Sequence, residues 1–323
     1  MWKAEDEELL KNPNFNCALE KYFDNEYYIR NDYAMLRNDA KDVNGTISRA
    51  YHCSNELLSK VFRHFKKNPE RVLVVGSSYD QALNAVYYGA KHVDVLDANL
   101  FAKPWGDYKI AMIKNLGFDE FCQQMFGSST FATPTLFNNN LCSRIFHDLP
   151  EDSKVFWGTV FMDGGGYRHI YGNILNSDTN LTRPDSVFYK NKFCYNKLKE
   201  RLCEGGCEIE CVPAEFTSFP DKIGDRKYDI IILSNVRGYV KNSVFNRVIS
   251  SLYSNNLKPG GSMEIDYSFH DDKRPEGTVN YFKAKYASRQ KLSDKYSVVF
   301  VDKPKKRCDK VKVPDLIDII NAL

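Results

Sequence analysis

The sequence has no long apolar run, and no stretch of it approaches the roughly 18 apolar residues that a membrane-spanning helix needs. Its opening residues, Met1 to Glu8, are rich in acidic side chains and contain no apolar segment of the kind found in secretory signals. The nine cysteines are an odd number, scattered from Cys17 to Cys308. These absences predict a soluble, cytoplasmic protein whose thiols are reduced.

Metal-binding patterns are also missing. Cys203, Cys207 and Cys211 are evenly spaced by four residues, but Gly205-Gly206 interrupts any helix that would align them. Neither a CxxC pair nor a CxxxCxxC run occurs in the chain. We therefore expect no metal site, with a metal or iron–sulfur cluster on these cysteines as the less favoured alternative.

An excess of charge of one sign is absent too. The 45 basic and 42 acidic side chains leave a net charge of +3, which does not indicate a nucleic-acid partner or an acidic membrane surface. The basic run from Lys303 to Lys312 is interpreted as a solvated face. The 20 Tyr and 21 Phe are interpreted as core packing, with an aromatic-lined pocket as the alternative.

What the chain does contain is a strand–helix–strand pattern of about 27 residues. Arg71–Val75 is a short β-branched run that suits a strand buried on both faces. It stops at Gly76, Asp80–Tyr88 has a helical pattern, and Gly89 stands where a helix C-cap belongs. His92–Asp97 is then a second strand that ends in a carboxylate, 21 positions after the glycine. This order of elements predicts a nucleotide-binding βαβ unit.

The chemistry of such a unit is specific. Glycine in the turn lets the backbone approach a ligand, and the amides of the following helix attract negative or polar groups. A carboxylate at the end of the second strand can accept hydrogen bonds from both hydroxyls of a ribose. The full GxGxxG pattern is absent. The candidate cofactor-binding residues are Gly76, Ser77, Ser78, Asp97, Ala98, Asn99, Glu215, Ser234 and Asn235.

Further strands follow downstream. A dehydrogenase would share the first βαβ unit, but a helix, a Lys-Pro-Gly-Gly turn and a strand in succession are typical of the S-adenosylmethionine-dependent fold. We therefore predict an α/β protein with the Rossmann-like class I methyltransferase fold, which has a mostly parallel central sheet and helices on both faces. The expected elements are strands Glu208–Val212, Tyr228–Leu233, Ser262–Asp266 and Ser297–Val301, helix Val244–Ser254 and the turn Lys258–Gly261. For the last strand, an antiparallel direction is the alternative.

The remaining segments give the domain organisation. Residues 1–65 are predicted to form an N-terminal helical segment, with helices at Ala18–Phe23 and Asn55–Phe65, the second capped by Ser54 or Asn55. Residues 66–323 are predicted to form the catalytic domain. Between its second and third strands we expect one or two helices in Tyr108–Phe126 and then a large insertion at about residues 128–206, placed over the ligand and carrying acceptor specificity.

Candidate catalytic residues are polar groups in the insertion and near the ends of the later strands. Tyr167, His169, Tyr239 and Asp266 are the main candidates. Arg168, His270 and Asp271-Asp272 are further ones, and a structural role is the alternative for each. The Gly164–Gly166 triplet before them is interpreted as a turn, with a phosphate cradle as the alternative.

Two patches of the sequence match a known family. The first contains Val95-Leu96-Asp97-Ala98-Asn99, Lys109, Leu116–Phe121 and Met125–Gly127; the second contains Phe188-Tyr189, Leu198–Leu202 and Tyr228–Val236. In them the chain resembles the S-adenosylmethionine:diacylglycerol 3-amino-3-carboxypropyl transferases of betaine-lipid synthesis and their uncharacterised relatives, over about half its length. It departs from them at Leu100-Phe101-Ala102, where the family usually has a proline and a glutamine.

The resemblance implies S-adenosyl-L-methionine as cofactor, with Asp97 as the ribose-binding acid, Gly76 beside the amino-acid moiety, and Ser234 and Asn235 facing the sulfonium. It favours transfer of the 3-amino-3-carboxypropyl group to a small-molecule or lipid acceptor, with peripheral membrane contact possible for the latter. Methyl transfer, which is common in this fold, is the alternative. A non-catalytic nucleotide-binding protein is the second alternative, and the oligomeric state is not predicted.

Overall fold

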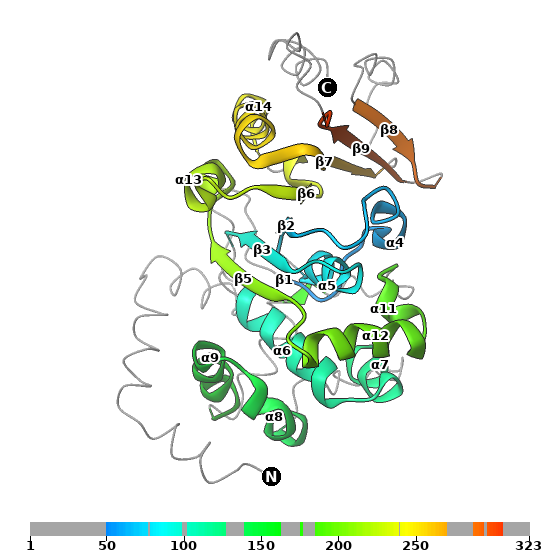
Figure 1. The fold of residues 1–323 in the computed structure, drawn as a ribbon. Helices are drawn as coiled ribbons and strands as arrows, with labels where there is room; N and C mark the ends of the chain where they lie inside the picture. The colour runs from blue at the N-terminus through cyan, green and yellow to red at the C-terminus, as the bar shows by residue number, and fades with distance from the viewer. Residues whose placement is uncertain are drawn as a thin grey trace. The chain divides into compact units, whose positions relative to one another are not determined.

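The computed structural model describes residues 50–76, 78–98, 102–126, 139–162, 175–176, 185–238, 240–269, 287–293 and 296–305 (Figure 1). The chain forms two compact units. One comprises Met1–Asn55, Ser77–Tyr79 and Asn99–Glu204, and the other Glu56–Gly76, Asp80–Ala98 and Gly205–Leu323. The helix predicted at Ala18–Phe23 lies outside the described residues, and the boundary at residues 65 and 66 stays a prediction.

The second unit is built on a seven-stranded sheet. The five strands on one side of it are parallel, and the last two form an antiparallel hairpin. This order and the terminal hairpin are those of the class I methyltransferase fold, so the predicted fold class is confirmed. In spatial order the strands are β5 (Glu208–Pro213), β3 (His92–Asp97), β2 (Arg71–Val75), β6 (Tyr228–Ile232), β7 (Leu257–Phe269), β9 (Tyr296–Asp302) and β8 (Ala287–Lys291).

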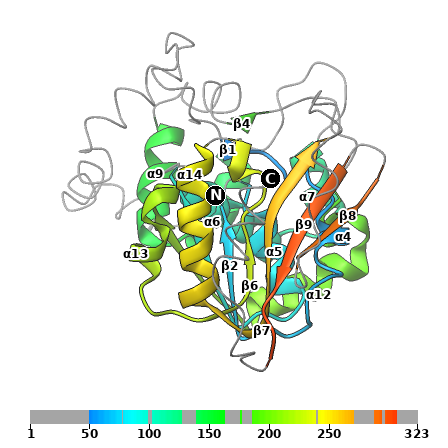
Figure 2. The same cartoon turned by 90° about the horizontal axis from the view of Figure 1, so that it is seen from above.

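Helices cover both faces of this sheet. From β2 the chain crosses through α5 (Asp80–Tyr87) to β3, and from β6 it crosses in the opposite direction through α14 (Asn242–Ser251) to β7. Since such crossovers are right-handed, the two directions place the two helices on opposite faces. Figure 2 shows α14 and the short α13 (Phe219–Ile223) on one side, and α5 and α4 (Leu58–Val61) on the other.

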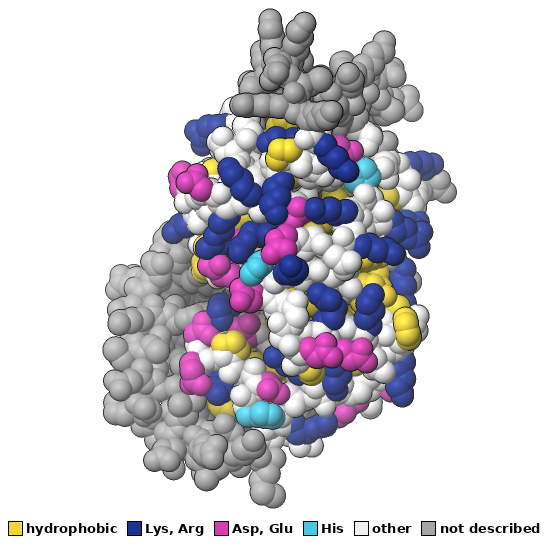
Figure 3. Space-filling view, in the orientation of Figure 1, with side chains coloured by type: hydrophobic (Ala, Val, Ile, Leu, Met, Phe, Trp, Pro, Cys, Tyr) yellow, Lys and Arg dark blue, Asp and Glu magenta, His cyan; other side chains and the backbone are white. Residues whose placement is uncertain are grey.

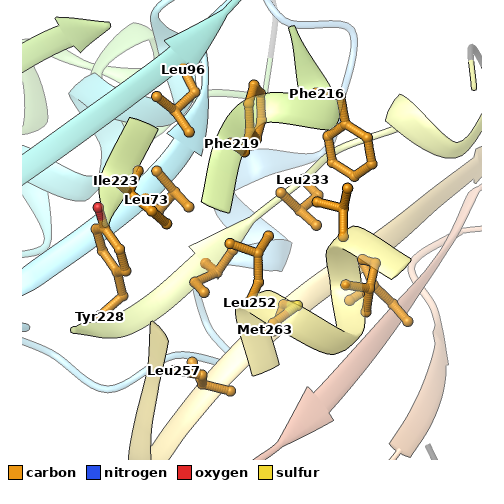
Figure 4. Close-up of a cluster of buried hydrophobic side chains, with 14 of the residues drawn as sticks. Leu73, Leu96, Phe216, Phe219, Ile223, Tyr228, Leu233, Leu252, Leu257 and Met263 are labelled. Carbon is orange, nitrogen blue, oxygen red and sulfur yellow. The ribbon is translucent and has the colours of Figure 1, made fainter. Parts of the chain in front are cut away.

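The face under α13 and α14 holds a large apolar core (Figure 4). Leu73 from β2, Ile231 from β6 and Met263 from β7 contribute to it, each fully buried. These residues alternate with neighbours that point to the opposite face, which explains why the strands read as continuous apolar runs. Other buried members are Leu96, Phe216, Phe219, Ile223, Tyr228, Leu233, Phe245, Val248, Ile249, Leu252, Leu257 and Ile265.

Two local predictions are corrected. The helix expected over Asn55–Phe65 is α-helical at Leu58–Val61 alone, and neither Ser54 nor Asn55 caps it, because Leu57 is the N-cap residue and has no side-chain cap. The Leu57 amide instead donates to the Tyr267 hydroxyl at 2.9 Å. The segment Lys258–Gly261, predicted as a turn before a strand, is a bulge inside β7, since Tyr228 pairs with Leu257 and Ile230 with Ser262.

The first unit is largely helical in its described part. The helices predicted in Tyr108–Phe126 are two, α6 (Ala102–Asn115) and α7 (Phe118–Phe126). The buried Tyr195 hydroxyl of α12 (Lys192–Cys203) donates to the carbonyl oxygens of Ile113 and Leu116, which ties α12 to the end of α6. The other elements are α8 (Asn139–Ile145), η2 (Phe146–Asp148), α9 (Glu151–Met162), α11 (Val187–Lys190), α12 (Lys192–Cys203) and the two-residue strands β1 (Ala50–Tyr51) and β4 (Leu175–Asn176).

The surface carries charges of both signs. On the face drawn in Figure 3, Lys and Arg side chains are interspersed with Asp and Glu. Some of them form ion pairs, such as Arg226 with Glu210 at 2.9 Å. In the part of the chain that the structure describes, no helix is long and apolar enough to cross a membrane.

Candidate functional site

The turn after β2 lies against the end of β3. Gly76 is buried, and its amide donates to the Leu96 carbonyl at 3.1 Å. A Cβ placed on Gly76 would come within 2.5 Å of Val95 Cγ1 and 3.4 Å of Asp97 Oδ2. No side chain therefore fits at this position, and the backbone of the turn stays next to the carboxylate that ends β3.

Asp97 is the last residue of β3 and is 7% exposed. Its carbonyl accepts a hydrogen bond from the Ala214 amide at 2.8 Å, which ties it to the chain after β5. The strand order reverses between β2 and β6, and ligands of open α/β sheets bind at the carboxyl ends of strands beside such a reversal. Gly76 and Asp97 both lie at the carboxyl ends of strands beside this point.

The carboxyl end of β6 bears a residue in an unusual backbone conformation. Ser234 has φ +58°, in the left-handed region that few side chains adopt. Its hydroxyl donates to Glu56 Oε1, and its amide donates to Glu264 Oε2 at 2.7 Å. The Asn235 side-chain oxygen lies 3.3 Å from the same hydroxyl. Ser234 is thus held by two carboxyl groups that come from other elements.

These two carboxyl groups are almost completely buried. Glu56 is 3% exposed and Glu264 is 1% exposed. Burial raises the pKa of Glu56 to about 7, although hydrogen bonds from Ser234 and Gln81 act in the other direction. Burial, and then the charge of Glu56, raise the pKa of Glu264 well above its usual value. Both carboxyl groups therefore favour the neutral, protonated form more than exposed carboxyl groups would.

The same region contains an ion pair and the start of α5. Asp266, on β7, is 3% exposed and lies 3.5 Å from the Arg237 guanidinium. Gln81, in the first turn of α5, donates to Glu56 Oε2 at 3.2 Å. Residues from β6, β7, α5 and the segment before α4 therefore form one polar group at the carboxyl edge of the sheet. We call Glu56, Ser234, Glu264 and Asp266 the acidic cluster.

In the first unit, the ammonium of Lys109 holds two backbone carbonyls. Its Nζ donates to the Ser78 carbonyl at 2.6 Å and to the His52 carbonyl at 3.0 Å, and it lies over the Trp105 ring. Lys109 is fully buried in α6. Ser78 belongs to the turn that was predicted to bind the cofactor, so Lys109 fixes the backbone of that turn.

The structure brings together part of the predicted site. Gly76, Asp97, Ala98, Ser234 and Asn235 lie at the carboxyl ends of β2, β3 and β6. Asp266 lies inside β7, two residues beyond the partner of Ile232, the last residue of β6. Glu215 is exposed and precedes the short helix η3 (Phe216–Ser218), where its carbonyl accepts from the Ser218 amide at 2.9 Å. The following lie outside the described residues: Ser77, Asn99, Tyr167, Arg168, His169, Tyr239, His270, Asp271 and Asp272.

Glu56, Gln81, Arg237 and Glu264 were missed by the sequence analysis. One of them had a usable signal, because Glu264 and Asp266 are the two acidic positions of β7 and alternate there with Met263, Ile265 and Tyr267. Glu56 had none, since it stands in a segment that looks like an ordinary amphipathic helix. Among the described residues, no group of His, Cys, Asp and Glu side chains is placed to hold a metal ion.

Several solved structures are similar to this chain. The rRNA methyltransferase aviRa from Streptomyces viridochromogenes is 12% identical, with a TM-score of 0.42 over 90% of this chain and 95% of that chain. The putative methyltransferase yhhF from Escherichia coli is 8% identical, with a TM-score of 0.33 over 78% of this chain and 88% of that chain. For the glycopeptide N-methyltransferase MtfA complexed with (S)-adenosyl-L-methionine, the identity is 9% and the TM-score 0.33, over 81% and 72% of the two chains.

No protein-family model matches the chain, and no curated protein matches it significantly. Because the TM-scores above are below 0.5, they support no conclusion about function. The class of fold follows from the strand order of the sheet itself.

Proposed function

We propose that this protein is an S-adenosyl-L-methionine-dependent transferase whose cofactor binds at the carboxyl edge of the sheet. The observation that carries the proposal is the Gly76–Asp97 pair. A turn with no room for a side chain lies against a buried carboxylate at the point where the strand order reverses. In this sheet order, that is the arrangement expected for a nucleoside whose ribose is recognised by a carboxylate.

The residues present fit such a cofactor. Asp97 would accept hydrogen bonds from the ribose hydroxyls, and Gly76 would let the backbone approach the sugar. Ser234 and Asn235 lie at the end of β6, beside the reversal of strand order. Ser77, Ser78, Ala98, Asn99 and Glu215 remain proposed contacts. When bound, the cofactor supplies a sulfonium whose adjacent carbons are open to nucleophilic attack, so the protein mainly has to orient the reactants.

Methyl transfer is the reaction that the fold favours, because the sheet has the class I methyltransferase order. Aminocarboxypropyl transfer is the second candidate, and one observation favours it. The sequence patches that resemble the aminocarboxypropyl transferases include Asp97 and Lys109, and Lys109 fixes the Ser78 carbonyl. A non-catalytic nucleotide-binding role is the remaining alternative.

The nucleoside product decides between these reactions. We would incubate the full chain with S-adenosylmethionine and a cell extract and identify the product by mass spectrometry. S-adenosylhomocysteine above the no-enzyme control would show methyl transfer, and methylthioadenosine would show aminocarboxypropyl transfer. Cofactor binding without either product would support the non-catalytic role.

The Asp97→Ala variant tests the cofactor site directly. We expect its affinity for S-adenosylmethionine, measured by calorimetry, to fall at least tenfold, because each lost hydrogen bond to a charged group contributes about 1.5–3 kcal/mol. Asp225→Ala is the matched control, since it removes an exposed carboxylate of the same unit. Equal affinities of Asp97→Ala and wild type would contradict the proposed site.

A further inference from the structure

The acidic cluster holds a carboxyl oxygen that the described residues leave unsatisfied. Glu264 Oε1 is buried and has no hydrogen-bond partner among them. The other oxygen, Oε2, accepts the amides of Leu233 at 3.1 Å and Ser234 at 2.7 Å. Glu264 forms no ion pair with any described residue, although Asp266 two positions later lies 3.5 Å from Arg237. A buried acceptor of this kind is costly unless a donor reaches it.

We infer that the acidic cluster binds a primary ammonium group, with Glu264 Oε1 as its acceptor. This inference rests on the proposed function and names the chemistry that the same site recognises. An ammonium carries three N–H donors and one positive charge. It therefore satisfies the free carboxyl oxygen and stabilises the ionised form of Glu264, which burial alone disfavours.

A cation of this kind suits the site better than a metal ion. The described His, Cys, Asp and Glu side chains form no group placed to hold a metal. The oxygens of Glu56 are also committed, one to the Ser234 hydroxyl and the other to the Gln81 amide. Glu264 Oε1 thus lacks a hydrogen-bond donor, while the neighbouring oxygens of Glu56 already have one each. This arrangement suits one small cation that carries several N–H donors.

Two molecules can supply the ammonium: the amino-acid moiety of the cofactor, or an amine acceptor. Wild type and Glu264→Gln would be titrated with S-adenosylhomocysteine, which has the amino group, and with methylthioadenosine, which lacks it. Glutamine keeps an oxygen for the Leu233 and Ser234 amides and removes the negative charge. If the cofactor is the source, Glu264→Gln loses at least tenfold in affinity for S-adenosylhomocysteine and keeps its affinity for methylthioadenosine.

The experiment that tests an amine acceptor as the source uses protein saturated with S-adenosylhomocysteine. If an amine acceptor is the source, n-butylammonium raises the melting temperature of wild type and leaves that of Glu264→Gln unchanged. Tetramethylammonium, which has no N–H donor, should have no effect on either. Asp229→Asn is the matched control, because it neutralises a buried carboxylate that Lys66 and Lys258 already pair.

Failure of the ammonium site and failure of the proposed function give different results in these experiments. If the nucleosides bind but Glu264→Gln alters neither the nucleoside preference nor the butylammonium effect, the ammonium site is overturned and the proposed function stands. If no nucleoside binds wild type, the proposed function fails, and butylammonium added to the free protein decides the ammonium site. Should Glu264→Gln not fold, Glu264→Asp replaces it in every arm, because it keeps the charge but shortens the side chain that has to reach the ammonium.

Discussion

At the scale of the residue, Gly76 stands where the fold leaves no room for a side chain. We expect Gly76→Ala to lower the free energy of unfolding by about 1–3 kcal/mol, because the new Cβ would lie 2.5 Å from the buried Val95 Cγ1. The same change should weaken nucleoside binding, since the turn must move away from Asp97. Urea denaturation and calorimetry measure the two effects.

The double variant Gly76→Ala/Val95→Ala separates these effects. Removing Val95 Cγ1 makes room for the new Cβ, so the double variant should be less destabilised than the sum of the two single changes. Strictly additive losses of stability would show that the contact with Val95 is not what excludes a side chain at residue 76.

Single residues could be predicted where the signal is local. Gly76 and Asp97 were found because a turn glycine and a strand-end acid occupy fixed places in a βαβ unit. Glu56 and Glu264 were not found, since 208 positions of sequence separate them, and the hydrogen bonds of Ser234 connect them only in the folded chain. Only the tertiary structure places those side chains together.

At the scale of the element, α5 depends on the glycine that ends it. Gly89 has φ +98°, and a Cβ there would overlap the Asn68 side chain and lie 3.1 Å from its Cα. Gly89→Ala should therefore lower the free energy of unfolding by about 1–2 kcal/mol, the usual cost of a side chain in the left-handed region. Gly117→Ala is the matched control, because no atom lies within 4 Å of its Cβ. Similar losses in urea denaturation for both variants would contradict this account of the helix end.

Most strands and helices of the second unit were predictable, because short β-branched runs and glycine caps are local signals. The start of the helix at Leu58 was not, since the amide of its N-cap residue, Leu57, donates to the Tyr267 hydroxyl of a strand 210 positions away. The bulge at Lys258–Gly261 was anticipated as a turn, but its place inside β7 depends on the register with β6. In both cases, contacts between residues far apart in the sequence determine the local structure.

At the scale of the whole molecule, the fold class could be predicted and the sheet order could not be read directly. The succession of strands, helix and Lys-Pro-Gly-Gly turn indicated a class I fold, and the fold then implied the order that the sheet has. No sequence signal indicated that the chain between β3 and β5 would cluster with Met1–Asn55 in a compact unit of its own. Packing between distant segments determines that division.

The buried carboxyl groups should make the stability of the whole chain depend on pH in an unusual direction. The pKa of Glu56 rises from 4.5 to about 7 on folding because of burial. Between these values the folded chain keeps a proton that the unfolded chain has released. The free energy of unfolding must therefore fall as the pH rises from about 4.5 to 7, by at most about 1.4 kcal/mol per pH unit for this group.

Glu56→Gln tests this dependence, because the amide stays neutral at every pH in that window. We expect urea denaturation at pH 5, 6 and 7 to show a falling stability in wild type and a flatter profile in the variant. The pKa of Glu264 is raised as well, so a slope that remains in Glu56→Gln should disappear in the Glu56→Gln/Glu264→Gln double variant. Parallel profiles for all three proteins would mean that the carboxyl groups of the acidic cluster do not take up protons on folding.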